Sequence, residues 1–282
     1  MVIDFHTHTF PDKIAARTVE KLKAMARAKA HTDATCGMLV DSMHEAGVDC
    51  SVVLPVATNV AQSEKLNEAA YEVNERWSGE GLLSFGAIHP AYEDYRALLH
   101  HIADLGLKGI KLHPQYQGIP FDDIRTMRIL DCASELGLIT VVHSGIDIGI
   151  EGPTMCTPDR VLHVMDEVAP EKLVLAHMGG WRMWDEVSDK LAGLPLYLDT
   201  SYSLGEIPRD ADTPRADSES ALMDAEQFTA LIEKHGADKI LFATDSPWGG
   251  QEQYLEQVRA LNLTEDEKRM ILGGNAQKLL KM

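Results

Sequence analysis

Two histidines near the amino terminus are the first residues whose types and spacing suggest chemistry. Asp4, His6 and His8 alternate in the segment MVIDFHTHTF, and every second side chain of a β-strand points to the same face. This pattern puts Asp4, His6 and His8 on one face and Ile3 and Phe5 on the other. Two imidazoles that project together from a rigid strand can chelate one divalent cation. The alternative is a pair of ordinary histidines at a strand end.

Three further residues able to bind a metal or carry a proton each close an apolar run. His143 ends LITVVH, His177 ends KLVLAH and Asp245 ends KILFATD. If each run is a strand of a parallel barrel, the carboxyl ends meet at one mouth, where the active sites of such barrels lie. Burial in the core explains any one of these residues. It would, however, have to place a polar residue at the end of four separate strands by chance. The set therefore indicates five ligands or proton carriers around one site.

The elements that must position these residues alternate between strands and helices. Apolar, β-branched runs predict eight strands, and the segments between them have helical periodicity, as in 122–136. Apolar strands that alternate with helices are typical of a parallel sheet covered on both faces. The pattern predicts an α/β fold, a distorted (β/α)8 TIM barrel that forms a single domain over residues 1–282. The predicted strands cover residues 2–6, 50–54, 82–88, 107–112, 138–142, 172–176, 195–199 and 239–244.

Two connections are longer than a minimal barrel needs. They cover residues 9–35 after the first strand and 200–223 after the seventh. The second is rich in Pro, Asp and Ser and is predicted to be a long loop. Both follow the carboxyl ends of strands and so belong at the mouth, and the alternative is a pair of surface insertions without a role.

Composition limits the partners and the compartment. The chain has 26 Lys and Arg against 44 Asp and Glu, a net charge of −18, which repels nucleic acid and anionic membrane surfaces. Four cysteines without CxxC spacing indicate reduced thiols and a cytoplasmic protein. We therefore expect a small-molecule substrate, no nucleic-acid or membrane partner, and a homodimer, the ordinary outcome for soluble enzymes.

Six segments together resemble the amidohydrolase superfamily. IDFHTH, GIKLHP, VVHSG, LAHMGG, ATDSPW and GGNAQKLL occur in this order over nearly the whole chain. Within the superfamily, the chain resembles the amidohydrolase 2 subgroup, which contains aminocarboxymuconate-semialdehyde decarboxylase, γ-resorcylate decarboxylase and oxalomesaconate hydratase-like proteins. The resemblance implies a TIM-barrel, metal-dependent enzyme.

The resemblance also implies a role for each residue at the mouth. It makes His6, His8, His143 and Asp245 the ligands of one divalent metal, zinc, and His177 the acid/base beside it. Three imidazoles and one carboxylate leave a position for water or a substrate oxygen, and zinc lowers the pKa of its water to about 7. Asp245 can also accept a proton from that water, so the choice between His177 and Asp245 as catalytic proton carrier stays open.

Lys111 in LKGIKLHP shares the inward face of its strand with Gly109 and His113 if the alternation holds. Binuclear members of the superfamily bridge two metals with a carboxylated lysine on the fourth strand, whereas the resembled subgroup is typically mononuclear. We favour Lys111 as a contact for a substrate carboxylate or phosphate, with a second metal on carboxylated Lys111 as the alternative. His113 is expected to line the substrate pocket and Trp181 to roof it. A strand cap and core packing are their respective alternatives.

These expectations combine into a metal-dependent hydrolase of a small, carboxylate-bearing substrate, in which a metal-activated water attacks a carbonyl carbon. The main alternative is a lyase of the same subgroup, a non-oxidative decarboxylase or a hydratase, because fold and ligands do not separate these reactions. A departing carboxylate needs a cationic contact, and Lys111 and Arg182 are compatible with that role. The third alternative is a metal-binding barrel without catalytic activity.

Overall fold

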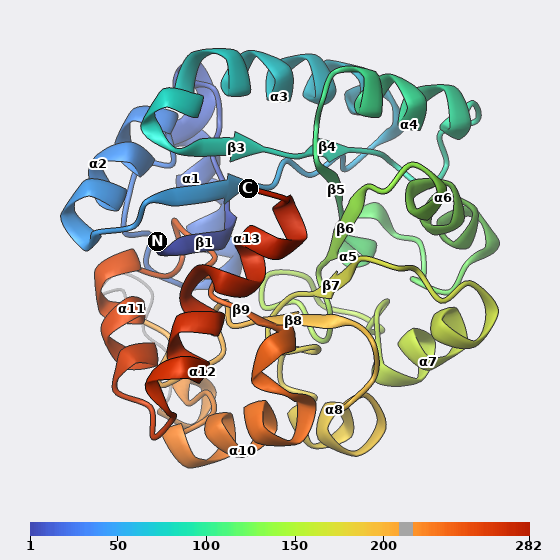
Figure 1. Cartoon of the computed structure of the whole chain (residues 1–282). Helices are drawn as coiled ribbons and strands as arrows, with labels where there is room; N and C mark the ends of the chain where they lie inside the picture. Colours follow the sequence, from blue (N-terminus) through green and yellow to red (C-terminus); the bar gives the residue numbers. More distant parts are fainter. Residues whose placement is uncertain (209–216) are drawn as a thin grey trace.

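The computed structural model describes residues 1–208 and 217–282, and strands and helices alternate along the chain (Figure 1). All pairs of neighbouring strands within the described sheets are parallel. The strands are β1 (Ile3–Thr7), β2 (Cys50–Val53), β3 (Leu82–Ser84), β4 (Gly86–Ala87), β5 (Gly109–Leu112), β6 (Ile139–Val142), β7 (Leu173–Leu175), β8 (Tyr197–Asp199) and β9 (Ile240–Leu241). Each of the eight predicted strands is present. The predicted strand 82–88 appears as two strands, β3 and β4, which Phe85 separates.

The strands close into the predicted TIM barrel. They form a three-stranded sheet, β1-β2-β3, and a six-stranded sheet, β4 through β9 in chain order. The chain itself joins β3 to β4 at one seam. At the other seam Phe5 N–H donates to the carbonyl of Phe242 at 2.8 Å, and Asp245 N–H donates to the carbonyl of His6 at 2.8 Å. These bonds bring the last strand back to the first and place Asp245 beside His6.

Helices cover the outside of the barrel (Figure 1). In α6, Asp123 caps the helix by accepting from Arg125 N–H, and Ile129 and Leu130 are fully buried, so the predicted helix at 122–136 is confirmed. No helix among the described residues is both long and apolar enough to cross a membrane. The α-helices are α1 (Asp12–Ala26), α2 (Cys36–Ala46), α3 (Ser63–Trp77), α4 (Tyr95–Asp104), α5 (Pro114–Gln117), α6 (Ile124–Glu135), α7 (Pro158–Glu167), α8 (Trp184–Lys190), α9 (Asp217–Ser220), α10 (Ala225–His235), α11 (Gln251–Arg259), α12 (Glu265–Arg269) and α13 (Asn275–Leu280).

The inside of the barrel is a packed apolar core. Phe5 and Phe85 are fully buried there, with ring centroids 5.9 Å apart in an edge-to-face contact. Leu279 and Leu280 of α13 belong to the same cluster, and Figure 1 shows α13 lying across the end of the barrel where both termini are found. Helix α13 thus covers the amino end of the barrel, and the mouth is at the opposite end.

The expected alternation in β1 breaks between Asp4 and His6. Pairing with β2 shifts register between Asp4 and Thr7, with one extra residue on β1, as in a β-bulge. Asp4 therefore does not share the face of His6: its carboxylate accepts from Thr244 and Gln251, whereas the His6 ring reaches the interior of the barrel.

The two long connections meet over the mouth. Ala28 from the first and Ile207 from the second are buried in one cluster with Trp181. An ion pair of 2.7 Å joins Arg27 to Glu219, so each connection supports the other. The first connection contains α1, and residues 209–216 of the predicted second loop lie outside the described residues.

Candidate metal centre

Three of the predicted metal ligands lie together at the mouth. The Nε2 atoms of His6 and His8 are 3.1 Å apart, and Asp245 Oδ1 lies 3.4 Å from the first and 3.2 Å from the second. Ligand atoms about 2.0–2.1 Å from a tetrahedral zinc ion lie about 3.3 Å from one another. The spacing of these three donors therefore fits a divalent metal.

Hydrogen bonds on the far side of each ring fix which nitrogen faces the site. His8 Nδ1 lies 2.8 Å from the carbonyl of Leu54, and since a carbonyl only accepts, His8 donates there and turns an unprotonated Nε2 inward. His6 Nδ1 donates to Asp199 Oδ2 at 2.9 Å. Burial raises the pKa of Asp199, but the adjacent His6 outweighs it and lowers the pKa overall. The lone pairs of His6 Nε2 and His8 Nε2 and the oxygen of Asp245 thus face one another. A cation between these three acceptors would stabilise them.

Lys111 supplies a buried ammonium group beside these donors. Its Nζ lies 3.1 Å from His6 Nε2 and its side chain is 1% exposed. Loss of hydration lowers the pKa of Lys111 to about 8, against the opposing effect of Asp199 and Asp245. The inward orientation expected for Lys111 is confirmed, whereas its role toward metal or substrate stays a prediction.

His177 and His143 form a second pair of imidazoles. His177 Nδ1 donates to the carbonyl of Ser201 at 3.0 Å, which leaves Nε2 to accept from His143 Nδ1 at 3.0 Å. His143 then carries its lone pair on Nε2, a buried atom without a hydrogen-bond partner among the described residues. Burial lowers the pKa of both rings, which favours this neutral arrangement.

The predicted ligand His143 is not part of the cluster formed by His6, His8 and Asp245. Instead, His143 Nε2 and His113 Nε2 each lie 3.6 Å from Asp147 Oδ2, and the two rings stack with centroids 4.1 Å apart. Tyr116 N–H donates to His113 Nδ1, so the proton of His113 is on Nε2 and points toward Asp147. A metal bond to His143 therefore stays a prediction, and so does contact of His113 with a substrate.

Trp181 packs against the two long connections above the mouth. Its indole N–H donates to the carbonyl of Tyr202 at 3.0 Å, its ring packs with Ala28 and Ile207, and the guanidinium of Arg182 lies 4.7 Å from the ring centroid. These contacts connect Trp181 to both long connections. Contact of Trp181 with substrate stays a prediction.

Sequence reasoning missed Asp199, the fully buried carboxylate at the end of β8. Beside its bond to His6, its Oδ1 accepts from the backbone N–H groups of His177 and Ser201, both at 3.0 Å. A polar residue that closes an apolar run is the signal that identified Asp245, and it applies equally to Asp199. Asp147 was also missed, and its loop carries no comparable signal.

Two site residues have a backbone conformation that L-residues rarely adopt. The φ angles of His177 and Asp245 are +60° and +63°, in the left-handed region, where a non-glycine residue costs about 1–3 kcal/mol. The hydrogen bond from Asp245 N–H to His6 and that from His177 N–H to Asp199 hold the two residues in place. Strain of this kind clusters at functional sites, which supports the assignment of the mouth as the active site.

Comparison with known proteins identifies relatives of the whole chain. The family model described as Amidohydrolase matches residues 3–282, and no curated protein matches. Similar solved structures include an uncharacterized TIM-barrel protein from Bordetella bronchiseptica (18% identity, TM-score 0.74, covering 99% of this chain and 98% of the other). Another is a 5-carboxyvanillate decarboxylase from Sphingomonas paucimobilis (14% identity, TM-score 0.69, covering 100% and 99%). A third is a dihydroxybenzoic acid decarboxylase from Polaromonas with bound manganese (15% identity, TM-score 0.65, covering 99% and 96%).

At these identities the solved structures establish the fold, while the family model covers the segments that carry the HxH pair, both later histidines and the final aspartate. The resemblance found in the sequence is thereby confirmed, and this chain belongs to the amidohydrolase family.

Proposed function

We propose that this chain is a metal-dependent lyase that removes a carboxylate group, without an oxidant, from a small carboxylated substrate. The observation that carries the proposal is the buried ammonium group of Lys111, 3.1 Å from a metal-type donor atom of His6. The names of two structural relatives, both decarboxylases of aromatic acids, favour this reaction over the hydrolysis expected first from the sequence.

The charges at the mouth support an anionic substrate. A metal on His6 Nε2 would occupy the lone pair that Lys111 now contacts, so the ammonium group would need another partner. A divalent cation and Lys111 would together carry one positive charge more than Asp199 and Asp245, the two carboxylates in contact with His6; the third buried carboxylate, Asp147, faces His113 and His143 instead. A buried surplus of positive charge is costly unless an anion pairs with it, and a substrate carboxylate meets that need.

The reaction breaks the bond between the carboxylate carbon and its neighbour, and a proton replaces the departing CO2. A divalent cation held by His6, His8 and Asp245 would supply positive charge to a substrate oxygen near the breaking bond. His177 would hold and deliver the proton at Nε2, which lies 3.0 Å from His143 Nδ1. Lys111 would bind the carboxylate before it leaves.

Hydrolysis of a small substrate is the second candidate, and Asp245 favours it. Burial raises the pKa of this carboxyl, but the facing His6 and His8 bring the pKa to about 2. A carboxylate that stays ionised at neutral pH would orient an attacking water by accepting a hydrogen bond from it.

One assay separates the two candidates. The protein, loaded with zinc or manganese, is incubated in D2O with a panel of hydroxylated benzoates and, separately, with esters and amides of the same acids. We expect CO2 release, with one deuterium on the carbon that carried the carboxylate. Cleavage of esters or amides without CO2 release from any free acid would overturn the proposal in favour of hydrolysis.

A further inference from the structure

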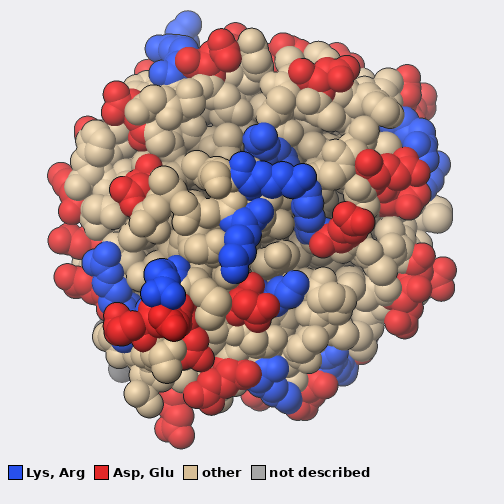
Figure 2. Space-filling view, in the orientation of Figure 1, with Lys and Arg blue, Asp and Glu red and all other residues tan. Residues whose placement is uncertain are grey.

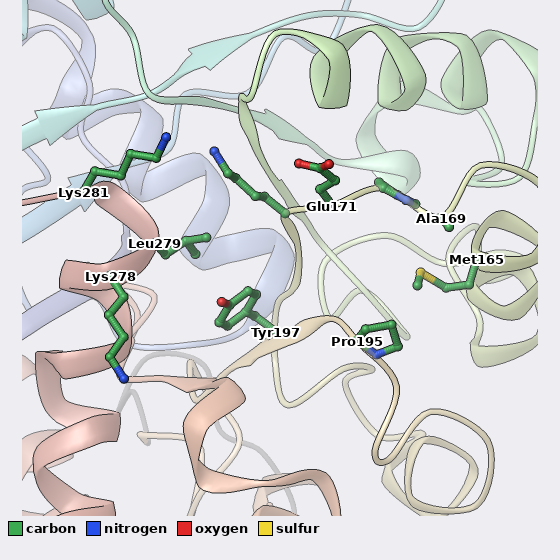
Figure 3. Close-up of a pocket in the computed structure, with 10 residues that line it drawn as sticks. Met165, Ala169, Glu171, Pro195, Tyr197, Lys278, Leu279 and Lys281 are labelled. Atoms are coloured by element: carbon green, nitrogen blue, oxygen red, sulfur yellow. The ribbon is translucent and has the colours of Figure 1, made fainter.

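The amino end of the barrel, opposite the mouth, contains a hollow. This basal hollow lies between α13 and the residues that precede β7 and β8, and its volume is about 480 Å³. Met165, Tyr197 and Leu279 form an apolar wall (Figure 3). Leu279 also belongs to the core inside the barrel, so that core separates the basal hollow from the metal donors.

Ammonium groups line the same hollow. Lys281, the residue after α13, and Lys172, before β7, line the hollow. Lys278 of α13 lines it as well, but its side chain points away from that of Lys281 (Figure 3). Lys172 is half-buried, and its Nζ donates to the carbonyl of Gly137 at 2.6 Å, which fixes the ammonium group in position. Burial, followed by the charge of Lys281, lowers the pKa of Lys172, which is the expected effect of cations close together.

These lysines lack an anionic partner within the described part of the chain. None of the ion pairs found within residues 1–208 and 217–282 involves Lys172, Lys278 or Lys281. Glu171 is the one acidic residue that lines the hollow. On a chain of net charge −18, Figure 2 shows Lys and Arg gathered near the middle of this face and most Asp and Glu toward its margin.

We propose that the basal hollow binds a small organic anion that carries at least two negative charges, as carboxylate or phosphate groups, on an apolar body. The ammonium groups would pair with the anionic groups, and the wall formed by Met165, Tyr197 and Leu279 would cover the apolar body. A volume of about 480 Å³ falls in the range of small-molecule sites, about 300–1,000 Å³. This site is independent of the reaction at the mouth.

The test is calorimetric titration of the zinc-loaded protein with three probes: phenyl phosphate, phthalate and inorganic phosphate. The double variant Lys172→Gln, Lys281→Asn removes two charges; Asn suits position 281 because its φ is +56°. The matched control is Lys13→Gln, Lys65→Gln, which removes the same charge from two exposed lysines elsewhere. A second variant, Lys172→Arg with Lys281→Arg, keeps the charge.

We expect phenyl phosphate or phthalate to bind the wild-type protein, the control and the arginine variant alike, and the double variant about tenfold more weakly. The tighter of these two probes identifies phosphate or carboxylate as the preferred group, and inorganic phosphate should bind more weakly than either because it lacks an apolar body. Binding of a probe at the mouth would persist in all variants and so stays distinguishable. Equal affinities in all four proteins, or no binding at millimolar concentration, would overturn the proposal.

Discussion

Lys111 Nζ and His6 Nε2 lie 3.1 Å apart, so the buried ammonium group occupies the lone pair through which His6 would bind a metal. The same ring is held from its other nitrogen by Asp199. His6 thus stands between a cation and an anion, and metal binding must displace the cation without moving the anion. Lys111 is then free to contact a substrate anion, so a substitution at Lys111 should change substrate binding.

Lys111→Met should raise KM for a carboxylated substrate about tenfold or more and leave the metal content unchanged. The reason is that an interaction used equally in ground and transition states appears mainly in KM. Steady-state kinetics and metal analysis check both points, with Lys65→Met as a control at an exposed lysine. Loss of metal would instead identify a carboxylated, bridging Lys111, and a lower melting temperature with unchanged KM would identify a role in folding.

The purified chain should bind about one divalent ion, and His6→Ala should remove it. His6, His8 and Asp245 present three converging donors, and loss of one leaves too few for tight binding. The control is His44→Ala, because the side chain of His44 is 64% exposed. Elemental analysis after dialysis measures the ratio. Undiminished metal in the His6 variant would refute the assignment of the centre.

His177→Asn should keep the metal and lower kcat about 10²–10⁴-fold, the usual contribution of a positioned proton carrier. Asn preserves a polar group toward the carbonyl of Ser201, which His177 Nδ1 contacts at 3.0 Å, but it has no ring nitrogen to titrate. Single-turnover rates on the metal-loaded variant test this. If the variant instead loses its metal, His177 is a ligand and Asp245 becomes the proton carrier.

The positions of the strands were predictable because the signal is local. Apolar, β-branched runs bounded by polar residues mark strands wherever they occur, and a polar residue at the end of such a run points to the mouth of a barrel. That rule locates His143, His177 and Asp245, and it applies equally to Asp199, which ends the predicted strand 195–199.

The arrangement within the site depends on contacts that the sequence does not encode locally. The extra residue in β1 appears only when β1 pairs with β2, and it reverses the faces of Asp4 and Phe5 expected from simple alternation. The hydrogen bond between His143 and His177 depends on which ring nitrogen of His177 carries the proton. The carbonyl of Ser201, which follows β8, fixes that proton on Nδ1. Such non-local choices need the assembled fold.

Asp123 offers a test of local stability that is independent of the mouth. Its carboxylate caps α6 and bonds the Arg125 side chain, which brings the pKa of Asp123 to about 2. Asp123→Ala should cost about 1 kcal/mol of unfolding free energy at neutral pH. A carboxyl group whose pKa is lower in the folded state stabilises the fold at pH values above its unfolded pKa of about 3.9. This stabilisation is lost as the pH falls toward the folded pKa.

Urea unfolding at several pH values checks this prediction, with Asp131→Ala at an exposed position of the same helix as the control. The difference in unfolding free energy between the wild type and the Asp123 variant should become smaller as the pH falls from about 4 to 2. A difference that stays constant over this range would mean that the cap does not depend on the charge of Asp123.

Asp199→Asn should weaken metal binding about 10–100-fold, the typical effect of losing a partner that orients a histidine ligand. Asp199 accepts from His6 Nδ1 at 2.9 Å and from His177 N–H at 3.0 Å. An amide in its place can turn its NH2 group toward His6, and His6 would then move its proton to Nε2, the nitrogen that the metal needs. The matched variant is Asp4→Asn, since Asp4 is equally buried but contacts His6 only through the backbone N–H. Metal titration against a competing chelator should therefore separate the two variants, with the larger loss for Asp199. Equal losses would mean that general destabilisation, and not the orientation of the His6 ring, sets the affinity.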